Sequence, residues 1–203
     1  MNKIRLHKIF LLISTIAVLH GIYMIVIAWG GELNPVALKF FTIQSNILVM
    51  IYFIHRIITY NKKSALSTYL LMSSLIAVII TGMVYNLVLV PIGGGPMIFS
   101  DYGNFATHLL ATILALINYF CFEQKGNFTR KHMLAGMIFP LLYWIVFISI
   151  GDLINFQPYF FMNPGQIGWP MVFVWLGVFV VVFVLLGLGI MAFDKKWGKQ
   201  SAK

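Results

Sequence analysis

The sequence predicts an all-α integral membrane protein that forms one bundle of six transmembrane helices over residues 1–203, with both termini in the cytoplasm. The observations behind this are the composition, the long apolar runs and the placement of basic residues between them. Of the 203 residues, 61% are hydrophobic and only 9% are charged, whereas a soluble domain carries about 45–50% apolar and about 25% charged residues. This composition excludes a water-soluble globule, a disordered chain and a nucleic-acid-binding protein.

Apolar runs that are each near or above the roughly 17–25 residues of a membrane-spanning helix divide the chain. The runs are Ile9–Trp29, Val36–Ile58, Leu66–Pro91, Gly103–Phe122, Met133–Gly151 and Gly168–Phe193. The first run follows basic residues, as in a signal peptide, but it exceeds the roughly 7–15 residues of a signal-peptide core and no A-x-A cleavage pattern follows it. We therefore expect it to be retained as the first helix.

Basic residues between the runs predict the orientation. Because six spans alternate in direction, the connections fall into two sets that lie on opposite sides of the membrane. All but one of the 14 Lys and Arg lie in one set, which comprises the N-terminus, residues 56–65, residues 123–132 and the C-terminus. The other set holds Lys39 alone. Since cytoplasmic loops carry the excess of Lys and Arg, both termini are predicted to be inside a cell membrane.

No metal or cofactor is expected. The single cysteine, Cys121, can form no disulfide within the chain. No carboxylate lies inside a predicted span, so none is placed to complete a hard-metal site with a histidine. The formal charge of +9 follows the predicted topology and does not indicate a nucleic-acid partner.

Polar residues inside the apolar runs mark the candidate site, because a polar side chain in hydrocarbon is costly unless it is paired or faces a cavity. Thr42, Ser45 and Asn46 share one face of the second run, since residues three and four apart are neighbours on a helix. At about 1.5 Å of rise per residue, Thr42, Asn86 and His108 all lie about 8–9 Å below the outer surface. The sequence therefore predicts one polar layer near the outer leaflet.

A threonine and a histidine in one layer fit nucleophilic acyl transfer. A hydroxyl is a weak nucleophile that needs a base to accept its proton, and histidine can accept it near neutral pH. The developing oxyanion needs hydrogen-bond donors. Asn46 and Asn86 are the candidate donors, and Tyr85 and Ser45 are further candidates for orienting the substrate.

Each of these residues also has a structural interpretation. Thr and Ser in membrane helices often bond back to their own backbone, and Asn and His often join neighbouring helices. His20 is expected to bond a neighbour rather than to line the cavity, and His7, His55 and His132 are expected at the basic inner interface.

Several short stretches carry a resemblance to a known family. They are residues 40–46 (FFTIQSN), residues 81–86 (TGMVYN), His108, residues 158–161 (PYFF) and Gly168-Trp169. In their order and spacing, the chain resembles the androgen-induced, or FAR-17a-like, membrane hydrolases, and more closely their bacterial six-helix relatives. The resemblance implies a threonine hydrolase that cleaves fatty acid esters of hydroxy fatty acids, with Thr42 as nucleophile and His108 as base.

The expected activity is therefore hydrolysis of a lipid ester that enters from the bilayer, in a bacterial plasma membrane. Two alternatives remain. A small transporter is disfavoured, because no carboxylate sits in mid-membrane to relay protons or bind cations and no inverted repeat is evident. A non-catalytic lipid-binding protein of the same fold is compatible with the sequence.

Overall fold

The structure, a computed structural model, describes residues 2–27, 31–60 and 64–201, and in this part of the chain it is helical apart from its connections. Six helical stretches in it are long and apolar enough to cross a membrane. They are Lys3–Val26, Phe41–Ile58, Ala65–Ile92, Tyr102–Phe122, Arg130–Ile150 and Trp169–Gly198. The predicted all-α membrane bundle is thereby confirmed. Trp29, Lys62, Lys63 and Lys203, on which parts of the prediction depend, lie outside the described residues.

The largest differences between the observed and the expected helix boundaries lie at three places. Helix α1 (Lys3–Val26) begins before Ile9, because the side chain of Asn2 accepts the backbone N–H of Ile4 and so caps the helix. Helix α2 (Phe41–Ile58) begins after Val36, because a 3₁₀ turn and the extended backbone of Phe40 precede it. Helix α8 (Trp169–Ser201) continues past Phe193 into a polar last stretch.

Two of the spans are not uniform α-helices. The third consists of α3 (Ala65–Val84), a π-helix over Tyr85–Leu89 and a 3₁₀ turn over Val90–Ile92. The fourth consists of α4 (Tyr102–Phe105), a π-helix over Ala106–Leu110, α5 (Ala111–Ile117) and a π-helix over Asn118–Phe122. Single π-turns inside α-helices often occur at functional sites.

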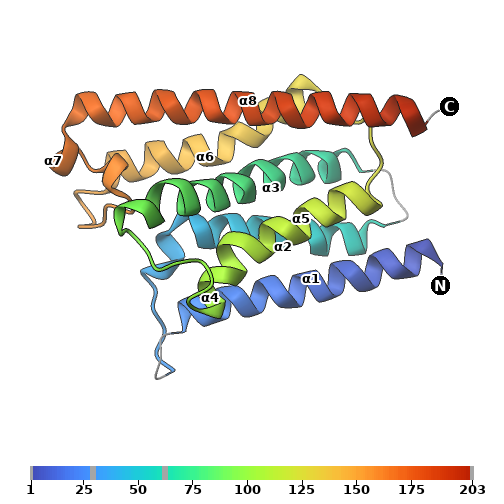
Figure 1. Cartoon of the computed structure of the whole chain (residues 1–203), viewed down its shortest axis with the longest axis horizontal. Helices are drawn as coiled ribbons and strands as arrows, with labels where there is room; N and C mark the ends of the chain where they lie inside the picture. Colours follow the sequence, from blue (N-terminus) through green and yellow to red (C-terminus); the bar gives the residue numbers. More distant parts are fainter. Residues whose placement is uncertain (1, 28–30, 61–63, 202–203) are drawn as a thin grey trace.

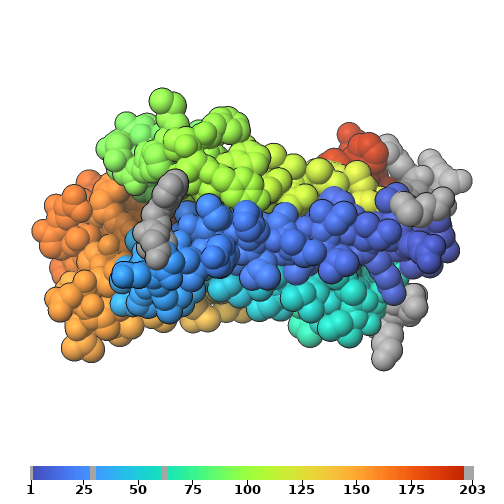
Figure 2. Space-filling model, turned by 90° about the horizontal axis from the view of Figure 1, so that it is seen from below, coloured from blue at the N-terminus to red at the C-terminus, as the bar shows by residue number. Residues whose placement is uncertain are grey.

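The helices run side by side along the long axis of the molecule, and both termini lie at the same end (Figure 1). We call this end, with residues 59, 60, 64 and 123–129, the basic end. The opposite end, with residues 31–40, 93–101 and 151–168, is called the site end. Figure 2 shows α1 between α2 and the fourth span on one face, with the connection before α8 beside residues 31–40 at the site end. The remaining α-helices are α6 (Arg130–Ile150) and α7 (Pro164–Ile167).

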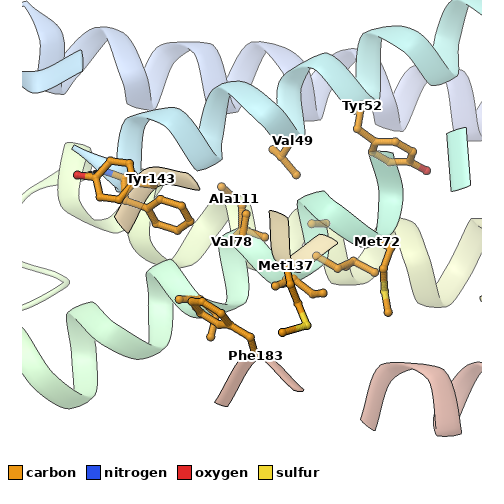
Figure 3. Packing of buried hydrophobic residues seen from close by; sticks show 14 of the residues in the cluster. Val49, Tyr52, Met72, Val78, Ala111, Met137, Tyr143 and Phe183 are labelled. Atoms are coloured by element: carbon orange, nitrogen blue, oxygen red, sulfur yellow. Dashed lines mark hydrogen bonds between the residues drawn. The ribbon is translucent and has the colours of Figure 1, made fainter. Parts of the chain in front are cut away.

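Helix α3 lies at the centre and packs against α2, α5, α6 and α8. Buried apolar side chains fill the space between these helices (Figure 3), among them Val49, Met72, Val78, Ala111, Met137 and Phe183. Between helices in lipid, close van der Waals packing of this kind drives association, since hydrocarbon tails are as apolar as the side chains.

A buried polar cluster closes the basic end. Asn118 forms hydrogen bonds with side chains of α1 and α2. Its Oδ1 lies 2.8 Å from Nε2 of His7, and its amide donates to the Tyr52 hydroxyl at 3.0 Å. Tyr52 and Arg56 both donate to Glu123, at 2.9 and 2.8 Å. His7 is buried in this network, with 1% of its surface exposed, at the basic end of the bundle where it was predicted to lie.

Candidate active site

Thr42 and His108 meet at the site end of the bundle. Thr42 is the second residue of α2, and His108 lies in the π-helix Ala106–Leu110. The Thr42 Oγ1 and the His108 Nε2 are 3.2 Å apart, which is within hydrogen-bonding reach for a nucleophile and its base. The two residues that the depth of the polar layer had paired are therefore in direct contact.

The position of Thr42 at the start of α2 leaves its hydroxyl available. Other threonines in the bundle donate their hydroxyl to the carbonyl four residues earlier, as do Thr15, Thr59, Thr81 and Thr107. For Thr42 that carbonyl belongs to Leu38, which precedes the helix and accepts instead from the Gln44 amide. Because the usual backbone acceptor is missing, the Thr42 hydroxyl can donate to His108.

The other ring nitrogen of His108 determines which tautomer is present. Its Nδ1 lies 3.1 Å from the backbone oxygen of Asn104 and 3.3 Å from Oγ1 of Thr107. A carbonyl can only accept, and the Thr107 hydroxyl donates its proton to Gly103. Both neighbours are therefore acceptors, so Nδ1 carries the proton and Nε2 presents a lone pair to Thr42.

Two glycines let the neighbouring helices approach the π-helix that holds His108. A Cβ atom on Gly21 of α1 would lie 2.7 Å from the Cβ of Ala106, and one on Gly82 of α3 would lie 2.8 Å from the backbone oxygen of His108. Small residues commonly allow such close backbone contacts in membrane bundles. The π-helix that contains His108 is thereby packed closely between α1 and α3.

Gly82→Ala is expected to lower the free energy of unfolding by about 1–3 kcal/mol. The added methyl group would clash with the backbone oxygen of His108, which cannot move aside as a flexible side chain could. Thermal unfolding in detergent measures the effect. Gly177→Ala is the matched control, since a Cβ on Gly177 of α8 meets nothing within 4 Å, and it should unfold at the wild-type temperature or slightly above. Equal midpoints for the two variants would contradict the close-contact interpretation.

Tyr85 supports the imidazole from one side. The rings of Tyr85 and His108 stack with centroids 3.6 Å apart and an interplanar angle of 20°. The Tyr85 hydroxyl donates toward the Pro96 carbonyl at 2.6 Å and also lies 3.1 Å from the Asn104 Oδ1. Its proton is therefore already used, and Tyr85 holds His108 and the connection before α4 rather than donating to a substrate.

Ser45 and Asn46 connect Thr42 to its surroundings through the backbone. The Asn46 amide nitrogen donates to the carbonyls of Thr42 and Thr107, at 2.7 and 2.8 Å. Ser45 lies 2.9 Å from the Thr42 carbonyl and 2.7 Å from the Thr81 hydroxyl. Because the amide N–H groups of Asn46 are already hydrogen-bonded, Asn46 cannot take the predicted oxyanion role. It instead connects α2 to the backbone beside His108.

Asn86 and His20 are not brought into the site. The Asn86 amide donates to the carbonyl of Gly82 in its own helical span at 2.8 Å. Asn86 therefore bonds back to its own backbone, and it does not take the expected oxyanion role. His20 is exposed and lies beside Tyr23 and Tyr102, with ring centroids 6.4 and 5.1 Å away, as expected for a residue outside the cavity.

Two tyrosines that sequence reasoning missed complete the surroundings of Thr42. Tyr143 of α6 accepts the backbone N–H of Phe41 at 3.1 Å and donates to the Lys39 carbonyl at 3.0 Å, so it caps the start of α2. Tyr159, in the connection before α7, interacts with the side chain and backbone of Thr42. The stretch 158–161 is part of the family resemblance, but no periodic pattern indicates where its side chains point.

The Tyr159 hydroxyl is a stable proton donor. Burial raises its pKa to about 12, although hydrogen bonds with Thr42, the Phe41 backbone and Tyr143 act in the opposite direction. The backbone N–H groups of Ile43 and Gln44 bond to Phe40 and that of Phe41 bonds to Tyr143. The remaining N–H of the first turn, on Thr42, faces Tyr159.

Two cavities meet at Thr42. The outer pocket, of about 370 Å³, opens at the site end and is lined by His108, Asn104, Thr107 and the connections at residues 92–96 and 158–160. The inner crevice, of about 40 Å³, lies between α3, α6 and α8, and its walls include Ile80, Trp144, Phe179 and Phe183. Thr42, Tyr85, Leu89 and Tyr159 line both. Among the described residues, no three His, Cys, Asp or Glu lie close enough to hold a metal ion.

The chain is similar along most of its length to Uncharacterized protein MG452 of Mycoplasma genitalium. The two are 29% identical over 199 residues, which cover 89% of this chain and 74% of that protein. No model of a known protein family matches the chain, and no solved structure matches it. Because the name of the mycoplasma protein states no activity, the chemistry of the site rests on its geometry.

Proposed function

We propose that this protein is an intramembrane threonine hydrolase of lipid esters, with Thr42 as the nucleophile and His108 as the general base and acid. The resemblance to the androgen-induced, FAR-17a-like hydrolases suggests fatty acid esters of hydroxy fatty acids, or similar esters, as substrates. The observation that carries the proposal is the 3.2 Å contact between the Thr42 hydroxyl and the unprotonated Nε2 of His108, whose Nδ1 proton is held by Asn104.

Hydrolysis proceeds in two acyl-transfer steps. His108 Nε2 takes the Thr42 proton as the oxygen attacks the ester carbonyl, and it then gives this proton to the departing alkoxide. A water molecule next loses its proton to Nε2 and attacks the acyl-threonine, and the proton returns to the Thr42 oxygen as the carboxylic acid leaves. The Asn104 carbonyl supports the imidazolium that forms in each step, since it accepts from Nδ1.

The start of α2 supplies the environment for the oxyanion. The N-terminus of a helix favours negative charge because its N–H groups point outward and the helix dipole is positive there. The Tyr159 hydroxyl lies against the backbone of Thr42 at this point, and it serves as the donor to the carbonyl oxygen of the ester. It takes the role that was predicted for Asn46 and Asn86.

A fluorophosphonate probe tests the proposal directly, because it reacts with an activated hydroxyl and loses fluoride. Purified protein in detergent is expected to gain one adduct, which peptide mass spectrometry locates at Thr42. His108→Ala should abolish labelling, whereas Thr15→Ala should not, because the Thr15 hydroxyl is bonded to the Leu11 carbonyl. A protein that takes up no probe, or a probe found away from Thr42, would favour a non-catalytic lipid-binding role.

The protein is further proposed to lie in a bacterial plasma membrane with its basic end in the cytoplasm. The described basic side chains cluster at that end, including Lys8, Arg56, Arg130 and Lys195, and cytoplasmic connections carry the excess of positive charge. Reporter fusions after Gln124 and at the C-terminus are expected to read inside, and a fusion after Leu153 outside. A C-terminal fusion that reads outside would refute this orientation.

A further inference from the structure

The two cavities that meet at Thr42 differ in their relation to His108. His108 lines the outer pocket and is absent from the walls of the inner crevice. We propose that the inner crevice binds the acyl chain of the ester and the outer pocket binds its alcohol, so that the preferred substrates are esters of a slender, unbranched acyl chain with a larger alcohol. This assignment rests on the proposed hydrolysis at Thr42.

Proton transfer fixes the direction of the ester. When the bond between the carbonyl carbon and the alcohol oxygen breaks, the departing oxygen must receive the proton that His108 Nε2 took from Thr42. The alcohol oxygen therefore has to lie within hydrogen-bonding distance of Nε2, on the side of Thr42 that faces the outer pocket. The acyl group remains on Thr42 after this step and occupies the opposite side, which is the inner crevice.

The shape and chemistry of the inner crevice suit an acyl chain. The crevice is narrow, with a volume of about 40 Å³, so it suits a slender chain better than a branched one. Trp144, Phe179 and Phe183 give it an apolar wall. Thr81, a polar residue in the wall, has its hydroxyl bonded to Ala77 and Ser45, so the crevice offers little to a polar alcohol.

The outer pocket suits the alcohol and the water of the second step. It is about 370 Å³ in volume and combines apolar residues such as Ile92 and Phe160 with the polar groups of Asn104 and Thr107. Once the alcohol has left, the same space admits the water that Nε2 deprotonates, so the water reaches the acyl-threonine from the side of its base.

Paired substitutions test the assignment on two sets of p-nitrophenyl and alkyl esters, one varied in the acyl chain and one varied in the alcohol. Phe183→Ala is expected to raise the relative kcat/KM for longer or branched acyl chains about tenfold or more. This is the discrimination that one or two methylene groups typically produce in an apolar pocket. Phe160→Ala should instead shift the preference among alcohols. Phe173→Ala is the matched control, because Phe173 lies on α8 with 60% of its surface exposed and should keep the wild-type preferences.

A measurement on the wild-type protein covers the case in which Phe183→Ala does not fold. An alkyl fluorophosphonate with a diazirine at the end of its chain reacts at Thr42, and its chain then takes the place of the acyl group. Photocrosslinks are expected on α6 near Trp144 or on α8 near Phe183. Crosslinks on residues 92–96 or 158–160, or a Phe183→Ala variant that changes only the alcohol preference, would overturn the assignment and leave the hydrolase intact. A wild-type protein that hydrolyses no ester and takes up no probe would overturn the proposed function and the assignment together.

Discussion

Thr42→Ala is expected to lower kcat/KM for ester hydrolysis by about 10³-fold or more, because it removes the atom that forms the acyl intermediate. His108→Ala should cost a similar amount, since a positioned general base contributes about 10²–10⁴-fold by itself. The double variant should be no slower than either single variant, because the two residues act as one unit. Initial rates on a panel of lipid esters, measured with purified protein in detergent, give all of these values.

Two further variants separate chemistry from structure. Thr42→Ser keeps the nucleophilic oxygen and should retain part of the activity. Thr15→Ala removes a hydroxyl from α1 that bonds only its own helix, so it should keep wild-type rates. If Thr42→Ala unfolds at the wild-type temperature and still turns over esters at the wild-type rate, Thr42 merely joins helices and the site is not catalytic.

The bundle and the central pair could be predicted from the sequence because both follow from simple periodic rules. The length of the apolar runs identified the spans. The rise of 1.5 Å per residue placed Thr42 and His108 at one depth, and in the structure they are 3.2 Å apart. Depth alone, however, says nothing about the direction in which a side chain points around its helix.

The direction of the side chains explains the roles that were assigned wrongly. Tyr85 and Asn86 are neighbours at the same depth, yet only Tyr85 stacks on His108, while Asn86 bonds back to Gly82. The π-helix that begins at Tyr85 changes the helical register there, and hydropathy does not encode such a change. Asn46 does face the site, but its amide is used by the Thr42 and Thr107 carbonyls.

The position of the Tyr159 side chain cannot be predicted from the periodicity of the sequence. It belongs to the connection at residues 151–168, which combines turns, a 3₁₀ helix and the short α7, so no repeating pattern fixes its orientation. Its position beside Thr42 arises from the packing of this connection against α2 and α6, where its ring lies 6.4 Å from the ring of Tyr143. Functional residues often lie in such connections, held by a rigid scaffold.

Tyr159→Phe is expected to lower kcat by about 10²–10³-fold, the usual cost of removing one donor to an oxyanion. KM should change little, because the hydroxyl acts on the charge that develops in the transition state while the ring still lines both cavities. The matched control is Tyr23→Phe, since Tyr23 is exposed on α1, and this variant should keep the wild-type rate.

The pH dependence of the wild-type rate gives an independent check on Tyr159. A tyrosine usually ionises near pH 10, but burial raises the pKa of Tyr159 to about 12. Because the pKa is raised, the protonated donor is fully present below about pH 10 and is lost only as the pH rises through about 12. Ester hydrolysis should therefore show no tyrosine-dependent loss of rate up to about pH 10. A decline centred near pH 10 in the wild-type protein that is absent from Tyr159→Phe would mean that the hydroxyl ionises as an exposed one does, and that burial does not keep it as the donor.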